Sequence, residues 1–154
     1  MLEATAAQWD TRLTINLCAG FLLGQAVGRH MRDNAVRGRM VFMTSLHAYA
    51  PRDLAHYSAS KAGLTMLMKE LARALGPHGI RVNALAPGSI PGGGSVVDMS
   101  TMERMIPLGR TGTPEDIAEM AVARLCDRFS AYVTRTTVAV DGGMALYNWL
   151  PSRT

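Results

Sequence analysis

The chain has 154 residues, of which 48% are apolar and 18% are charged, a composition typical of one globular domain and not of a disordered chain. Its formal net charge is +4, but the basic residues are scattered without a run or interleaved aromatics, so no nucleic-acid-binding surface is indicated. The longest apolar stretch, from Ile15 to Val27, is too short and too polar to span a bilayer. The amino-terminal residues also lack the pattern of a signal peptide, so we expect no membrane association and a soluble cytoplasmic protein.

The two cysteines, Cys18 and Cys126, form neither a CxxC pair nor a Cys/His cluster with zinc-ligand spacing, so no metal site is predicted. Each lies in an apolar stretch of helical character, and we expect both to be buried free thiols. Free thiols favour a reducing compartment, in agreement with a cytoplasmic location.

The first predicted element is a helix from about Ala6 to Arg32, because apolar residues recur in it at roughly helical spacing. After the polar segment DNAVRGR, the run RMVFMTS is rich in strand formers and suits a strand covered on both faces. A second helix is predicted in YSASKAGLTMLMKELARALG, where Gly76 and Pro77 give the signal that ends it. Its apolar stripe consists of Leu64, Leu67, Met68, Leu71 and Leu75.

The carboxyl-terminal half continues the alternation. GIRVNALAP is predicted to be a second strand that ends at Pro87, and the glycine-rich GSIPGGGS to be a loop. GTPEDIAEMAVARL opens a third helix, with Thr113 as N-cap, Pro114 at the first helical position and Asp116 completing a capping box. TTVAVDGG is predicted to be a third strand.

Strands that alternate with long helices imply right-handed crossovers and a parallel sheet with helices on both faces. We therefore predict an α/β chain with an incomplete doubly wound sheet of about three strands, in a single partial domain over residues 1–154. One edge of so small a sheet would carry unpaired backbone groups.

The stretch HYSASKAGL places Tyr57 four residues before Lys61, so a helix presents both side chains on one face. A phenol ionises with a pKa of about 10, and a nearby ammonium favours the phenolate, so the pair can serve as general acid/base between an alcohol and a carbonyl. Ser45 ends the strand VFMTS, where ligands bind in such sheets, and could hold the substrate oxygen. The alternative is a core tyrosine with a polar tip and a lysine that extends to solvent.

Nearly the whole chain resembles the short-chain dehydrogenase/reductase family. The similarity is carried by GRMVFMTS, HYSASKAGLTMLMKELARALGPHGIRVNALAPGSI, IPLGRTGTPEDIAEMAVARL and AYVTRTTVAVDGGM. WDTRLTINLCAGFLLGQAV resembles the helix that precedes the serine strand. The resemblance implies a Rossmann-type fold and the ordered active-site residues Asn16, Ser45, Tyr57 and Lys61.

The resemblance also implies a role for each of these residues. Tyr57 would donate or accept the proton, Lys61 would favour the phenolate and hydrogen-bond the nicotinamide ribose, and Ser45 would hold the substrate oxygen. Asn16 would maintain a water-linked proton relay to Lys61. Since asparagine is unfavourable within an apolar helix, a local backbone distortion around a bound water would give it a purpose.

The cofactor-binding residues implied in this way are Tyr57, Lys61, Pro87, Gly88 and Ile90. The substrate-binding residues implied are Ser45, His47 and Tyr57. A surface position is the alternative for His47, and structural work at the end of the last strand is expected of Asp141.

Two of the departures from the family bear on the cofactor and on the fold. Members begin with a strand and a TGxxxGxG turn that binds the pyrophosphate at a helix N-terminus, and this sequence has no such turn. The phosphate-binding half is thus absent, and NAD and NADP cannot be distinguished. Arg135 stands in YVTR where glycine is usual, which predicts a strained backbone with positive φ.

Three hypotheses follow. The first is an NAD(P)-dependent oxidoreductase, truncated relative to the family, that acts on a small-molecule alcohol or carbonyl. The second is a non-catalytic remnant that serves only as an interaction or oligomerisation module, and the third an α/β domain with YxxxK by chance. A homo-oligomer, dimer or tetramer, is expected because the family assembles through the helices that match residues 16–31 and 57–75.

Overall fold

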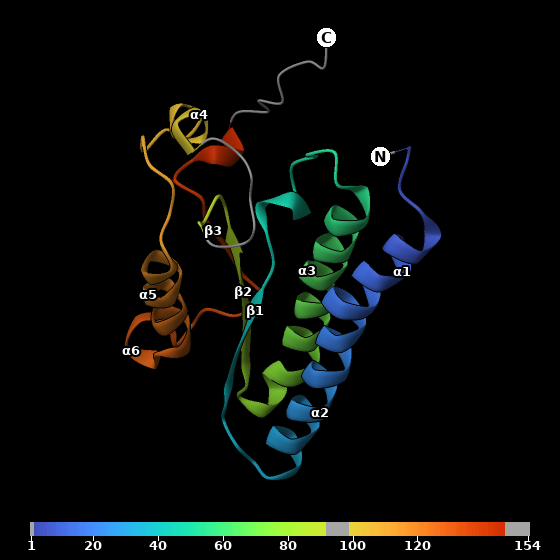
Figure 1. The fold of residues 1–154 in the computed structure, drawn as a ribbon. Coiled ribbons are helices and arrows are strands. Elements are labelled where there is room, and N and C mark those ends of the chain that lie inside the picture. Colours follow the sequence, from blue (N-terminus) through green and yellow to red (C-terminus); the bar gives the residue numbers. More distant parts are fainter. Residues whose placement is uncertain (1, 92–98, 147–154) are drawn as a thin grey trace.

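The computed structural model describes residues 2–91 and 99–146 (Figure 1). Its helices are α1 (Ala6–Leu13), α2 (Ala19–Asp33), α3 (Ala55–Leu75), α4 (Met99–Arg104), α5 (Pro114–Leu125) and α6 (Asp127–Ser130). Its strands are β1 (Arg39–Met43), β2 (Arg81–Pro87) and β3 (Thr137–Val140). A π-helical turn, η1 (Thr14–Cys18), joins α1 to α2, and the short 3₁₀ turns are η2 (Leu46–Ala48), η3 (Gly76–His78) and η4 (Met144–Leu146).

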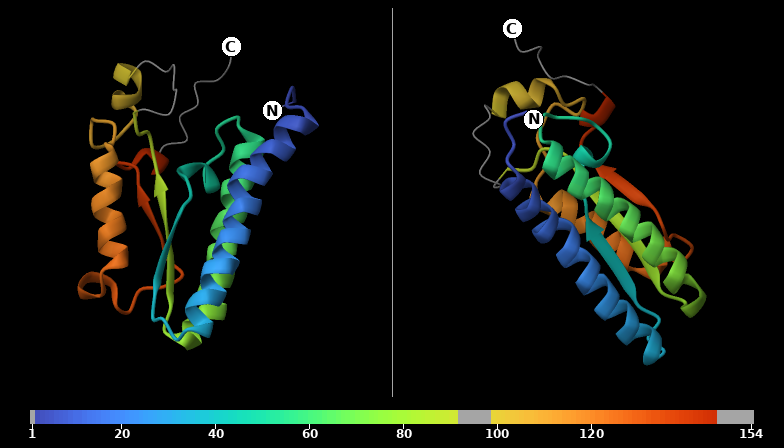
Figure 2. Two further views of the ribbon diagram at one scale, coloured as in Figure 1. Left: turned by 60° about the horizontal axis from the view of Figure 1, so that its bottom comes forward. Right: turned by 90° about the vertical axis from the view of Figure 1, so that its right-hand side faces the viewer.

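The three strands form one parallel sheet in the order β1-β2-β3. Arg39 pairs with Arg81 at one end of the β1–β2 ladder, and Leu85 pairs with Val138 in the β2–β3 ladder. Figure 2 shows α2 and α3 on one face of the sheet and α5 on the other. The predicted α/β arrangement with an incomplete doubly wound sheet is therefore confirmed. Within the described ranges no helix has the length and apolarity needed to cross a membrane.

The core forms between α3 and the central strand. All β2 residues from Arg81 to Ala86 are buried, because this strand has a neighbour on each side and a helix on each face. The largest buried cluster consists of Met68, Ala72, Leu75, Ile80, Val82 and Ala84. Of the stripe expected on α3, Leu64, Met68 and Leu75 are buried as predicted. The carboxyl-terminal half of α3 is thus fixed to the sheet. Because the helix is continuous, its amino-terminal turns are held in position as well.

The long amino-terminal helix is interrupted where its sequence is unfavourable. The predicted helix from Ala6 to Arg32 contains the π-helical turn η1, and Asn16 lies in the middle of that turn. The expected backbone distortion at Asn16 is confirmed. The prediction of buried thiols was wrong for Cys18, which is exposed, and Cys126 is half-buried. Only one face of α1–α2 packs on α3, and Cys18 lies outside that face although its neighbours are apolar.

Two further local predictions are confirmed. Thr113 caps α5, with its side chain accepting the Asp116 N–H and the Asp116 carboxylate accepting the Thr113 N–H. Arg135 has φ of 64°, and its N–H donates to the Val82 carbonyl at 2.7 Å. A side chain in this left-handed region is strained, which is why glycine would fit better at this position.

Helices α2 and α3 approach closely at Gly24. A Cβ placed on Gly24 would lie 2.8 Å from Leu71 Cδ1 and 3.1 Å from the Phe42 ring. Leu71 and Phe42 are both packed against the core cluster, so neither can withdraw freely. The absence of a side chain at Gly24 therefore sets the distance between the two helices.

Replacing Gly24 tests this contact. We expect Gly24→Val to lower the free energy of unfolding by about 1–3 kcal/mol, because overpacking displaces Leu71 or Phe42. Gly76→Ala is the matched control, since a Cβ at Gly76 meets nothing within 4 Å and its φ of −53° suits any residue. Urea unfolding of the two variants measures both effects, and an equal loss in the control would contradict the role of close packing.

Candidate functional site

The predicted site residues gather where the parallel strands end. Ser45 follows β1 and is 7% exposed, because Thr44 anchors the end of β1 to the Leu85 carbonyl through both its N–H and its hydroxyl, each at 2.8 Å. The Ser45 Oγ accepts the His47 N–H at 3.3 Å as the cap of η2. The hydroxyl hydrogen remains available for a ligand oxygen. Ser45 is therefore held rigidly at the strand end with a donor to offer.

Tyr57 and Lys61 occupy the first turns of α3 and lie on one face. The Lys61 ammonium is 5.6 Å from the centroid of the Tyr57 ring and donates to the Met43 carbonyl at 2.9 Å. Burial lowers the pKa of the Lys61 ammonium. Because Met43 ends β1, this hydrogen bond ties the candidate acid/base pair to the sheet.

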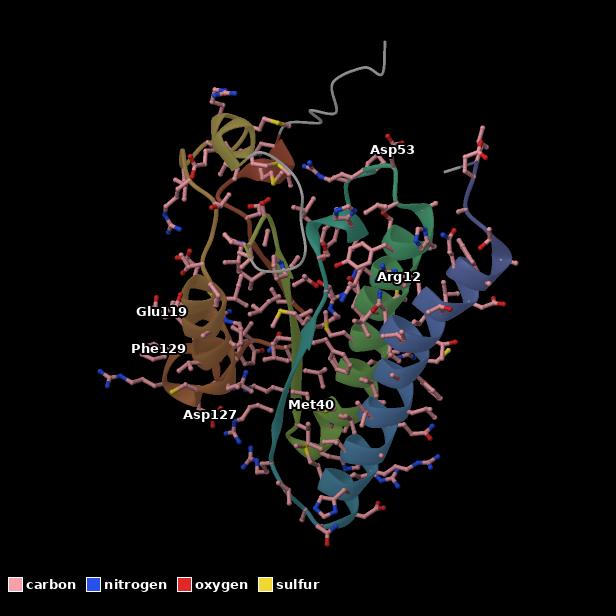
Figure 3. The ribbon with its side chains drawn as sticks, in the orientation of Figure 1. Arg12, Met40, Asp53, Glu119, Asp127 and Phe129 are labelled. Atoms are coloured by element: carbon pink, nitrogen blue, oxygen red, sulfur yellow. The ribbon has the colours of Figure 1, made fainter. Side chains whose placement is uncertain are left out.

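Two further groups surround the Tyr57 ring. The His47 ring meets it edge-on with 5.1 Å between centroids, and the Arg12 guanidinium lies 6.0 Å from its centroid. Figure 3 shows Arg12 on α1, the helix that runs beside α3. Burial, and secondarily the charge of Arg52, lowers the pKa of His47, so its neutral form is favoured. Nitrogen-bearing side chains from three segments thus lie around the half-buried ring of Tyr57.

Asn16 reaches the same turn of α3 through a residue that sequence reasoning missed. Its Nδ2 donates to Ser60 Oγ at 3.0 Å, and Ser60 Oγ donates to the Tyr57 carbonyl at 2.7 Å. Ser60 is completely buried. In the sequence Ser60 is one of several small residues between Tyr57 and Lys61. The one sequence feature that could have identified it is a hydroxyl three residues after the tyrosine, on the face of the helix that is buried. Ser60 links the π-helical turn to the backbone that carries Tyr57.

The residues predicted to bind the cofactor lie at the end of the neighbouring strand. Gly88 donates its N–H to the Val140 carbonyl at 3.0 Å, and a Cβ on Gly88 would lie 2.7 Å from the Asp141 Cα. Pro87 and Ile90 are half-buried beside it. Through the described residues, the hydrogen bonds of this segment run to β3 and Gly112 and not to Tyr57. The pairing of β1 with β2 places these residues at the same end of the sheet as Ser45.

Asp141 has the structural role expected of it. Its two carboxylate oxygens accept the N–H groups of Gly143 at 2.9 Å and Ala145 at 2.8 Å. These bonds hold the chain reversal after β3 and place η4 against the η2 region. Leu46, Ile106 and Met144 form a buried apolar cluster there.

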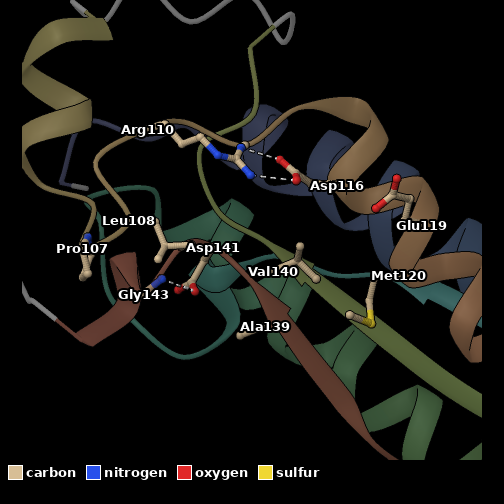
Figure 4. A pocket seen from close by; sticks show the side chains of 12 residues that line it. Pro107, Leu108, Arg110, Asp116, Glu119, Met120, Ala139, Val140, Asp141 and Gly143 are labelled. Atoms are coloured by element: carbon tan, nitrogen blue, oxygen red, sulfur yellow. Dashed lines mark hydrogen bonds and ion pairs between the residues drawn. The ribbon is translucent and has the colours of Figure 1, made fainter.

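A cavity of about 650 Å³ lies between α5 and β3 (Figure 4). Arg110 and Asp116 on its wall are paired at 2.7 and 2.9 Å, which lowers the pKa of the Asp116 carboxyl. Neither Tyr57 nor Lys61 lines this cavity. The candidate acid/base pair therefore lies outside this cavity, whose other charged lining residues are Glu119 and Asp141.

The link through Ser60 can be tested by a double-mutant cycle. We expect Ser60→Ala to lower the free energy of unfolding by about 1–3 kcal/mol, because the Tyr57 carbonyl loses a hydrogen bond and the half-buried Asn16 amide loses its acceptor. The double variant Asn16→Ala/Ser60→Ala should cost less than the sum of the two single variants. Chemical denaturation of the four proteins measures this difference, and strict additivity would show that the two side chains are not coupled.

Three comparisons place this geometry among known proteins. The family model described as Enoyl-(Acyl carrier protein) reductase matches residues 1–145. Glucose 1-dehydrogenase 2 of Bacillus subtilis (strain 168) is 36% identical over 151 residues, which cover 94% of this chain and 58% of that protein. 3beta-hydroxysteroid dehydrogenase 1 of Eggerthella lenta is 39% identical over 147 residues, which cover 91% of this chain and 56% of that protein.

The fold is shared with solved structures of the same kind. A short chain dehydrogenase from Leptospira borgpetersenii with bound NAD+ superposes with a TM-score of 0.87 at 28% identity, covering 94% of this chain and 59% of that one. The chain thus spans somewhat more than half the length of the relatives it matches. Because the family model covers nearly all of its residues, the chain belongs to the short-chain dehydrogenase/reductase family.

Proposed function

We propose that this chain carries the proton-transfer and substrate-binding groups of a nicotinamide-dependent oxidoreductase that interconverts an alcohol and a carbonyl. The observation that carries the proposal is the position of Tyr57, on the first turns of α3 with the Lys61 ammonium 5.6 Å from its ring. Ser45 ends the adjacent strand, where ligands of open parallel sheets bind. The named activities of the relatives, dehydrogenases of a sugar and of a steroid, support the same reaction class.

Each side chain has one task in the proposed reaction. In the reducing direction Tyr57 gives its hydroxyl proton to the carbonyl oxygen of the substrate, and in the oxidising direction the phenolate takes the proton from the alcohol. Ser45 donates a hydrogen bond to that same oxygen as negative charge develops on it. The Lys61 ammonium stabilises the phenolate by its charge. A bound nicotinamide would supply the hydride in the first direction and accept it in the second.

The chain offers a fit for the nicotinamide end of such a cofactor, which can be NAD or NADP. Lys61 has three donor hydrogens and gives one to the Met43 carbonyl, so it retains donors for ribose hydroxyls. Pro87, Gly88 and Ile90 lie half-buried at the end of β2, where the family resemblance expects the carboxamide. No TGxxxGxG turn occurs in this sequence, so the proposal extends to the nicotinamide and ribose and not to the pyrophosphate.

The exposed apolar side chains of the helix pair support the expected self-association. Phe21, Leu22 and Leu23 on α2 are 45%, 61% and 67% exposed, and Met66 on α3 is 55% exposed. We extend the proposal to a homo-oligomer that covers these side chains. They also support the alternative in which the chain acts only as an oligomerisation module without redox chemistry.

Tyr57→Phe tests the acid/base assignment. We expect the variant to lose at least about 100-fold in the rate of NADH- or NADPH-dependent carbonyl reduction, because the proton donor at the substrate oxygen is gone. Tyr132→Phe is the matched control, since Tyr132 is fully exposed and distant in sequence from the site. Steady-state turnover across a panel of aldehydes and ketones gives the comparison. Retained turnover in Tyr57→Phe would remove Tyr57 from its role, and no turnover in the unmodified chain would favour the oligomerisation module.

Cofactor affinity is a separate expectation. Because the sequence lacks the glycine-rich turn, NADH and NADPH should bind this chain with dissociation constants well above the micromolar range. Titration followed by nicotinamide fluorescence measures these constants, with Lys61→Met as the variant that should weaken binding further. Micromolar binding by the unmodified chain would show that the pyrophosphate has a site among these residues.

A further inference from the structure

Arg52 lies in the loop between η2 and α3, five residues before Tyr57, and its side chain is incompletely paired. One terminal nitrogen donates to the Met144 carbonyl over a long 3.4 Å. Its Nε is buried and has no hydrogen-bond partner among the described residues. A buried, charged N–H without an acceptor is costly, so an acceptor supplied from outside the described residues would stabilise it.

The protein supplies only partial compensation for this charge. Burial lowers the pKa of the Arg52 guanidinium, and the opposing influence is the charge of Asp141. Both Asp141 oxygens already accept backbone N–H groups, those of Gly143 and Ala145. Asp141 therefore acts on Arg52 through its charge and does not satisfy the buried Nε.

Arg52 is connected to Tyr57 through His47. The charge of Arg52 acts on the His47 ring, which in turn lies 5.1 Å edge-on from the Tyr57 ring. The His47 Nδ1 is also buried without a partner among the described residues. Two buried nitrogens without partners among the described residues thus occur in η2 and in the loop that leads from it to Tyr57. A second polar group on a ligand held at Tyr57 would supply an acceptor to the Arg52 Nε.

We propose that Arg52 binds a carboxylate of the substrate, so that the alcohol or carbonyl converted at Tyr57 is a hydroxy acid or an oxo acid. This inference rests on the proposed function. A guanidinium matches a carboxylate with two parallel N–H···O bonds, and Nε with one terminal nitrogen forms such a pair. The carboxylate supplies an acceptor to the buried Nε and a negative charge beside the guanidinium.

The direct test follows the Arg52 Nε–H resonance of the ¹⁵N-labelled chain by NMR during titration with acetoacetate or with its neutral ester, methyl acetoacetate. We expect a saturable shift of this resonance with acetoacetate and none with the ester. Arg52→Gln should abolish saturable acetoacetate binding at the His47 and Tyr57 resonances, and Arg52→Lys should weaken it. Arg128→Gln, which removes an exposed guanidinium elsewhere, is the control and should bind as the unmodified chain does.

Turnover gives a second, independent readout. The ratio of kcat/KM for acetoacetate to that for methyl acetoacetate should fall about 10- to 100-fold in Arg52→Gln, the range typical of a lost hydrogen bond to a charged group. No saturable shift with acetoacetate, an equal shift with the ester, or an unchanged ratio would overturn the carboxylate site. Turnover of neutral carbonyls without carboxylate binding would overturn this inference and leave the proposed function intact. Carboxylate binding without any turnover would support the carboxylate site and contradict the proposed function.

Discussion

The buried hydroxyl of Ser60 is the point at which the helix pair and the candidate active site depend on each other. It accepts from Asn16 on one side and donates to the Tyr57 carbonyl on the other, with no access to water. A buried polar network of this kind is stable only when every member is satisfied. Any shift of η1 along α3 breaks one of these bonds, so the position of the Tyr57 backbone is fixed by the packing of a different helix.

The same dependence holds in place the part of the candidate site that lies on α3. The carboxyl-terminal half of α3 is fixed in the core beside β2, and the Gly24–Leu71 contact fixes α2 against it. The first turns of α3 project beyond the core to the strand ends, where they carry Tyr57 and Lys61. Tyr57 and Lys61 are therefore half-buried, while the helix that carries them is held by the core. Fixed positions of this kind suit the proposed acid/base role.

Much of this could be predicted from the sequence, because the signals are local. The alternation of strand-forming and helical segments gave the parallel α/β arrangement, the capping residues Thr113 and Asp116 gave the start of α5, and Arg135 in a glycine-like position predicted positive φ. What could not be predicted depends on tertiary partners. The exposure of Cys18, the bridging role of Ser60 and the unmatched Nε of Arg52 follow from which face of each helix or loop meets which neighbour, and periodicity does not contain that information. The roles of Ser45, Tyr57 and Lys61 stay predictions, although the structure places them at one end of the sheet.

The π-helical turn has a consequence for the angular phase of the amino-terminal helix. Arg12, Asn16, Gly20, Gly24 and Gly28 follow one another at intervals of four residues, and all of them meet side chains of α3. In an ideal α-helix each residue turns about 100°, so positions four apart drift by about 40° per step and the ends of this series would face in nearly opposite directions. The wider turn at η1 removes a large part of that drift. The extra residue in the π-helical turn thus keeps Asn16 on the same face of the helix as Gly20, Gly24 and Gly28. One helix can therefore contact the candidate active site at one end and pack closely on α3 at the other.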